Sequence, residues 1–132
     1  MTTIIYIAGP MTGLPDSNYP AFHQAAGELR GAGYDVLNPV VSGRRRDAPR
    51  RGAGQVEGAT WSDYMRNGLN QLVRADGIAL LPGWHRSRGA CIESNIAREL
   101  DITSGTVDDW LRRAYGETWL LDVIAARPEG KN

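Results

Sequence analysis

Glu93 is the side chain with the clearest potential for chemistry in this 132-residue sequence. It lies in the first turns of a helix expected to begin at Ser87–Gly89, beside an apolar stripe formed by Ile92 and Ile96. A partly buried carboxylate in such a place can attack the anomeric carbon of a sugar and form a glycosyl-enzyme intermediate. A glutamate in the first turn of a helix can also serve only to stabilise the helix dipole. The helix alone does not decide between these interpretations.

Tyr6 lies in the middle of the apolar segment TIIYIA, residues 3–8. Such a segment, without polar alternation, is typical of a strand buried on both faces. A buried tyrosine hydroxyl needs a hydrogen-bond partner. Tyr6 is therefore either a satisfied core residue or the donor to a carboxylate such as Glu93.

A glycine-containing turn follows this strand directly. Its residues are Gly9, Pro10, Met11, Thr12 and Gly13. The turn is neither GxGxxG nor a P-loop, because no GK[ST] sequence is present. Its backbone N–H groups and a threonine hydroxyl could hold a phosphate or a ribose. The alternative is an ordinary turn between a strand and a helix.

A second loop carries further candidates for ligand binding. Ser87 and Gly89 precede a helix, where Ser87 could cap the helix or help to bind an anion, and both roles could coexist. Trp84 and His85 lie in the same loop and could stack on a nucleobase. Asn38, at the end of the second expected strand, is a candidate at the same edge of the sheet.

The elements that must position these side chains alternate along the chain. Strands are expected at 3–8, 34–37, 78–81 and 118–124, and helices at 20–30, 60–75, 87–100 and 106–115. This alternation predicts a three-layer α/β fold, a parallel sheet of four to five strands with helices on both faces. Right-handed crossovers then bring the loops 9–19, 38–59 and 82–89 to the carboxyl edge, where such sheets bind ligands.

The length predicts a single domain over 1–132. Lys+Arg and Asp+Glu both number 15, and this balance argues against a general polyanion partner. Five arginines nevertheless fall in 44–51, within the Arg/Gly-rich loop 40–59, and Arg86 and Arg88 lie in another loop at the same edge. Because no interleaved aromatics or helical period support nucleic-acid binding, an anionic small molecule explains this surplus better.

Several classes of site and location are not favoured. Cys91 is the single cysteine, so no internal disulfide can form, as is usual in a reducing compartment. The apolar N-terminal stretch is too short for a signal peptide, and no apolar run has the length of a membrane span. We therefore expect a cytoplasmic protein without a membrane partner. His23 and His85 lack metal-ligand spacing, so neither a metal nor another cofactor is expected.

Five segments in order form a more specific pattern than any one motif: IYIAGPMTG, NYPAF, AGYDVLNP, TWSDYMR and ADGIALLPGWHRSRGACIES. The pattern resembles the small phage-associated family of the nucleoside 2-deoxyribosyltransferase-like superfamily. The resemblance covers about Ile4 to Leu100, whereas residues 104–132 diverge.

The resemblance implies a flavodoxin/Rossmann-like sheet and cleavage or transfer at an N-glycosidic bond. It makes Glu93 the nucleophile and Tyr6 the residue that orients it. It also matches the turn at 9–13 to the superfamily's glycine-rich loop after strand one, and it places a 5′-phosphate near Ser87 and Gly89 in members that use nucleotides. Assembly into a homo-oligomer is implied as well.

One position departs from the resembled superfamily. An aspartate usually stands eight residues before the aspartate of the third strand, which here is Asp76, and this sequence has Gly68 there. Glu93 thus lacks the usual second carboxylate. Two hypotheses follow: cleavage or deoxyribosyl transfer on a 2′-deoxynucleoside or its 5′-monophosphate, and non-catalytic binding of a nucleotide or ADP-ribose-like ligand.

Overall fold

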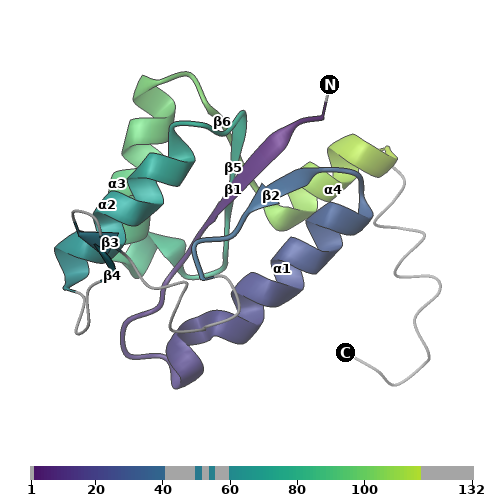
Figure 1. The fold of residues 1–132 in the computed structure, drawn as a ribbon. Coiled ribbons are helices and arrows are strands. Elements are labelled where there is room, and N and C mark those ends of the chain that lie inside the picture. Colours follow the sequence, from purple (N-terminus) through teal and green to yellow (C-terminus); the bar gives the residue numbers. More distant parts are fainter. Residues whose placement is uncertain (1, 41–49, 52–53, 56–59, 117–132) are drawn as a thin grey trace.

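The protein is described by a computed structural model covering residues 2–40, 50–51, 54–55 and 60–116. Its centre is a parallel four-stranded sheet in the order β2-β1-β5-β6 (Figure 1). The strands are β1 (Ile4–Ala8), β2 (Asp35–Leu37), β5 (Gly77–Leu80) and β6 (Thr103–Thr106). Helices cover both faces of the sheet, so the predicted three-layer α/β fold is confirmed.

Each face of the sheet has its own apolar core. Successive side chains of a strand point to opposite faces, and in β1 Ile5 and Ile7 enter one core whereas Tyr6 and Ala8 enter the other. All four of these residues are buried. This explains why β1 is a continuous apolar run with one tyrosine in it.

Two pairs of helices build the outer layers. α1 (Tyr19–Gly31) and α4 (Val107–Tyr115) contribute to the core around Ile5 and Ile7, and α2 (Trp61–Leu72) and α3 (Arg88–Glu99) to the core around Tyr6. Short 3-10 turns, η1 (Pro15–Asn18) and η3 (Trp84–Arg86), precede α1 and α3. The helices predicted over 20–30, 60–75, 87–100 and 106–115 are therefore present, with small shifts at their ends.

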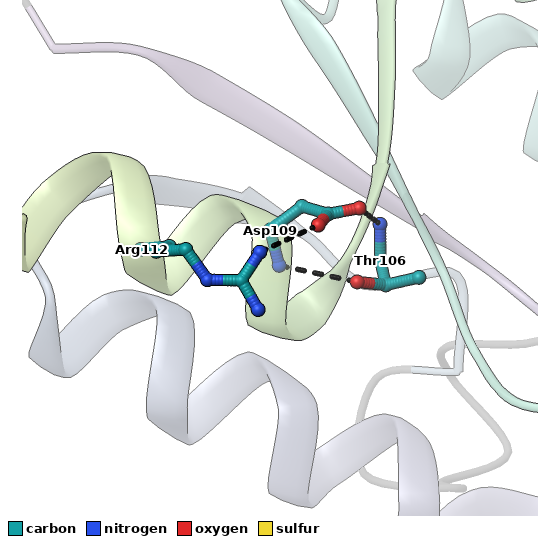
Figure 2. Close-up of polar contacts among 3 residues, drawn as sticks. All are labelled: Thr106, Asp109 and Arg112. Atoms are coloured by element: carbon teal, nitrogen blue, oxygen red, sulfur yellow. Dashed lines mark hydrogen bonds and ion pairs between the residues drawn. The ribbon is translucent and has the colours of Figure 1, made fainter. Parts of the chain in front are cut away.

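Strand β6 was not predicted. Its sequence, Thr103–Thr106, is short and polar, and it pairs with β5 at the edge of the described sheet. An edge strand with exposed side chains has no apolar run to reveal it. β6 leads directly into α4, where Thr106 and Asp109 form a capping box and Arg112 contacts Asp109 at 3.3 Å (Figure 2).

The long loop expected over 40–59 contains two short described strands. β3 (Arg50–Arg51) and β4 (Gly54–Gln55) pair antiparallel, and β3 contacts α2. The rest of the arginine cluster lies outside the described residues, as does the strand predicted over 118–124. Within the described ranges, no helix is both long and apolar enough to cross a membrane.

Candidate active site

The candidate site is built on Tyr6 and Glu93, which are 87 residues apart in sequence. Tyr6 points from β1 into the core beneath α2 and α3, and Glu93 lies on α3. The Tyr6 hydroxyl donates a hydrogen bond to Oε2 of Glu93. Tyr6 is 1% exposed and Glu93 is 7% exposed, so this polar pair is almost removed from water.

Burial changes the acid–base behaviour of both side chains. Loss of hydration raises the pKa of Glu93 from 4.5 to about 7, and the hydrogen bond from Tyr6 opposes that rise. The pKa of Tyr6 is raised well above its usual value of 10.0, first by burial and then by the Glu93 charge. Tyr6 therefore keeps its proton and acts as the donor, while Glu93 is near its midpoint of ionisation at neutral pH.

The backbone of α2 lies directly against this pair. A Cβ atom at Gly68 would lie 2.6 Å from both the Glu93 Oε2 and the Tyr6 Oη atoms. No real Cβ tolerates contacts that short without movement of its neighbours. The glycine that stands where the resembled superfamily has an aspartate is thus in contact distance of the two reactive groups.

A cavity of about 250 Å³ opens over the pair at the carboxyl end of β1. Ligand pockets are typically about 300–1,000 Å³, so this one suits a small ligand. Several aromatic side chains line it, and Glu93 is the only charged side chain among its described lining residues. Those aromatic residues are Tyr6, Tyr19, Phe22, Trp61 and Tyr64.

The structure brings most of the predicted site residues to this cavity. Besides Tyr6 and Glu93, the lining includes Gly9, Met11, Thr12, Gly13, Ser87 and Gly89. Gly9 also has a packing role, because a Cβ there would lie 2.7 Å from Cβ of Leu81. The Oγ of Ser87 accepts a hydrogen bond from the backbone N–H of Ala90 at 3.2 Å, so Ser87 caps α3 and lines the cavity as well.

Three predicted residues do not line the cavity. The carbonyl of Pro10 accepts a hydrogen bond from Nδ2 of Asn18 at 2.9 Å, which ties the turn to η1. Asn38 is buried, and its Oδ1 accepts a hydrogen bond from the backbone N–H of Val40 at 3.1 Å. Trp84 packs against the core on the α2 and α3 face.

The contribution of α2 to the lining of this cavity was not predicted from the sequence. Trp61, Tyr64, Met65 and Asn67 all line the cavity. Trp61 and Met65 also fit an apolar stripe along this helix, but Trp61 is 41% exposed. The available signal was the aromatic pair at positions 61 and 64, three residues apart and thus on one face of the helix.

A cationic side chain contacts one of the aromatic residues that line this cavity. The guanidinium carbon of Arg88 lies 4.0 Å from the ring centroid of Trp61, a cation–π contact between the first turns of α3 and α2. Burial raises the pKa of Tyr19, and the nearby Tyr64 raises it further. Aromatic rings and Glu93 thus line the same cavity.

The arrangement is suited to covalent chemistry at an electrophilic carbon. A buried carboxylate that is partly ionised at neutral pH can act as a nucleophile, and a fixed hydroxyl donor can hold one of its oxygens in place. Within the described ranges, no three His, Cys, Asp or Glu side chains lie close enough together to hold a metal ion.

Comparison with known protein families finds a match over most of the chain. The family described as "Domain of unknown function (DUF4406)" matches residues 3–104. The chain belongs to the DUF4406 family. The matched region of this DUF4406 protein contains every residue of the site described above, from Tyr6 to Glu93. A search of curated proteins found no match.

Proposed function

We propose that this DUF4406 protein cleaves the N-glycosidic bond of a 2′-deoxynucleoside or its 5′-monophosphate. The observation that carries the proposal is the buried Tyr6–Glu93 pair beneath a cavity lined by aromatic side chains. The resemblance to the nucleoside 2-deoxyribosyltransferase-like superfamily supports the same chemistry. The proposed setting is cytoplasmic, and a homo-oligomer is part of the proposal by the same resemblance.

In the proposed reaction, a Glu93 carboxylate oxygen forms a bond to C1′ of the sugar. The C1′–N bond breaks, its electron pair leaves with the base, and the base takes up a proton from solvent. Water or a second base then attacks C1′, gives up a proton to solvent and displaces the carboxylate. Only the ionised form of Glu93 is nucleophilic, so a pKa of about 7 leaves a substantial reactive fraction at neutral pH.

The other cavity residues have supporting roles in this proposal. The Tyr6 hydroxyl fixes the orientation of the carboxyl group through its hydrogen bond. Trp61 and Tyr64 provide flat apolar surfaces for a base, since aromatic rings prefer offset stacking. Gly9, Met11, Thr12 and Gly13 of the turn line the cavity, as does Ser87 at the N-cap of α3. Their backbone N–H groups are available in this proposal to sugar or phosphate oxygens.

One observation favours a second candidate function. Glu93 is the only carboxylate among the described residues that line the cavity, and Gly68 occupies the place where a second one would be expected. A general acid that protonates the leaving base can contribute about 10²–10⁴-fold to a rate. Without it, the same cavity could hold a nucleotide or ADP-ribose-like ligand without turnover.

Incubation with a panel of 2′-deoxynucleosides and their 5′-monophosphates tests the two candidates. The enzyme proposal predicts free base, detected by chromatography, and loss of that product in Glu93→Ala. The matched control is Glu99→Ala, which changes an exposed glutamate on the same helix and should retain activity. No base from any substrate, together with tight binding by calorimetry, would replace the enzyme proposal with the binding one.

A further inference from the structure

We infer that Gly68 is a positioning residue whose missing side chain allows the backbone of α2 to pack against Tyr6 and Glu93 and hold them in contact. The inference deepens the proposed function and rests on it for the role of Glu93 in catalysis. Its geometry is independent of any substrate.

Gly68 lies in the interior of α2, where the helical backbone conformation does not require a glycine. It is the eighth residue of a helix that spans Trp61–Leu72, and its φ lies outside the left-handed region. Glycine in a helix interior is less favourable than alanine, because more backbone entropy is lost on folding. A reason for glycine at position 68 must therefore come from its surroundings.

The surroundings supply that reason in the two side chains of the candidate site. The nearest atoms to a Cβ built on Gly68 are Oε2 of Glu93 and Oη of Tyr6, both at 2.6 Å, and the third is the carboxyl carbon of Glu93 at 3.8 Å. These two oxygen atoms are the acceptor and the donor of the Tyr6–Glu93 hydrogen bond. Any side chain at position 68 would therefore occupy the space of that bond.

The close approach of α2 also controls the surroundings of the carboxyl group. Gly68 is itself buried, so its backbone excludes water from this side of Glu93. The other titratable side chains that line the cavity with Glu93, within the described ranges, are Tyr6 from β1, Tyr19 from α1 and Tyr64 from α2. Because no described charged group lines the cavity besides Glu93, the hydrogen bond from Tyr6 is the polar contact that a side chain at position 68 would disturb.

Gly68→Ala tests the inference, and Gly27→Ala is its matched control. Both glycines lie inside helices, but a Cβ at Gly27 would meet nothing within 4 Å. The Glu93 carboxyl is followed by NMR titration of protein labelled with carboxyl-¹³C glutamate, with Glu93→Gln used to assign its resonance. This readout needs no substrate, so it gives a result even if no nucleoside is cleaved.

The expected result is a Glu93 titration midpoint at least half a pH unit higher in Gly68→Ala than in the wild type. The added methyl group separates Tyr6 from Glu93, so the buried carboxylate loses the donor that favours its ionised form. Gly27→Ala should titrate like the wild type. An unchanged or lowered midpoint in Gly68→Ala would overturn the inference.

A second measurement keeps the test decisive if Gly68→Ala folds poorly. The change in melting temperature caused by Gly68→Ala is compared in the wild type and in Tyr6→Phe, where one of the two obstructing oxygens is absent. We expect the loss of melting temperature to be at most half as large in the Tyr6→Phe background. Equal losses, or failure to fold in both backgrounds, would show that other contacts determine the glycine at position 68.

Discussion

Replacement of Glu93 by glutamine should stabilise the protein, and more strongly as the pH rises. Burial raises the pKa of Glu93 from 4.5 to about 7. Between these values the folded chain holds a proton on Glu93 that the unfolded chain releases, so rising pH favours unfolding. The stability contributed by the protonated carboxyl is full below about pH 4.5 and is lost as the pH rises through about 7.

The size of the effect follows from the two pKa values. Each pH unit of difference corresponds to about 1.4 kcal/mol, and the two titration curves together give a loss of roughly 2–3 kcal/mol between pH 5 and pH 8. Glu93→Gln keeps the size of the side chain and an oxygen that can accept the hydrogen bond from Tyr6, but it cannot ionise. Its advantage over the wild type should therefore grow by about that amount over the same pH range.

Urea denaturation at pH 5 and at pH 8 measures this difference, with circular dichroism as the signal. Glu99→Gln is the matched control, because Glu99 lies on the same helix and is exposed. The control variant should differ from the wild type by a small amount that does not depend on pH. If the advantage of Glu93→Gln is the same at both pH values, or shrinks at pH 8, the assignment of Glu93 as a buried carboxyl with a raised pKa is wrong.

Three other substitutions test separate parts of the account. Tyr6→Phe removes the hydrogen bond that lowers the pKa of Glu93. In a plot of base-release rate against pH, the rise on the acidic side should therefore move to higher pH. A pH profile identical to that of the wild type would contradict the role of Tyr6. Thr60→Ala removes the N-cap of α2 and should cost about 1 kcal/mol of unfolding free energy in urea, whereas no loss would mean that this cap is dispensable. Gly77→Ala places a Cβ 2.3 Å from the Trp110 ring and should lower the free energy of unfolding by about 1–3 kcal/mol. This loss would be seen as a lower melting temperature, and an unchanged melting temperature would refute the close packing of α4 on β5.

The central strands and the helices could be predicted because their buried positions are occupied by apolar residues with the spacing of a strand or a helix. The run at β1 is apolar because both of its faces are covered. Thr60 and Asp63 have the residue types and spacing of a capping box, and they form one at the start of α2. β6 could not be predicted in this way. Its residues, Thr103–Thr106, are polar and largely exposed at an edge of the described sheet, so no hydrophobic pattern sets them apart from a loop.

The loops of the candidate site could be predicted from the sequence, but the way in which α2 packs against them could not. The strand order places the end of β1 beside the start of α3, and the loops at the carboxyl edge of a parallel sheet were therefore good candidates. The contribution of α2 depends on how that helix is rotated over the sheet. An apolar stripe that includes Trp61 does not reveal whether its first turn enters the core or lines a cavity. The contact of Gly68 with the Tyr6–Glu93 pair is a tertiary contact of the same kind, and only the packed structure contains it.

The most direct test of the central proposal is a search for a sugar bonded covalently to Glu93. Wild-type protein is mixed with a 2′-deoxynucleoside that yields free base, quenched in acid and digested, and the peptide containing Glu93 is examined by mass spectrometry. The account predicts a deoxyribosyl ester on Glu93, and no such peptide adduct in Glu93→Gln. Base release without any adduct on Glu93, continuing at the wild-type rate in Glu93→Gln, would contradict it.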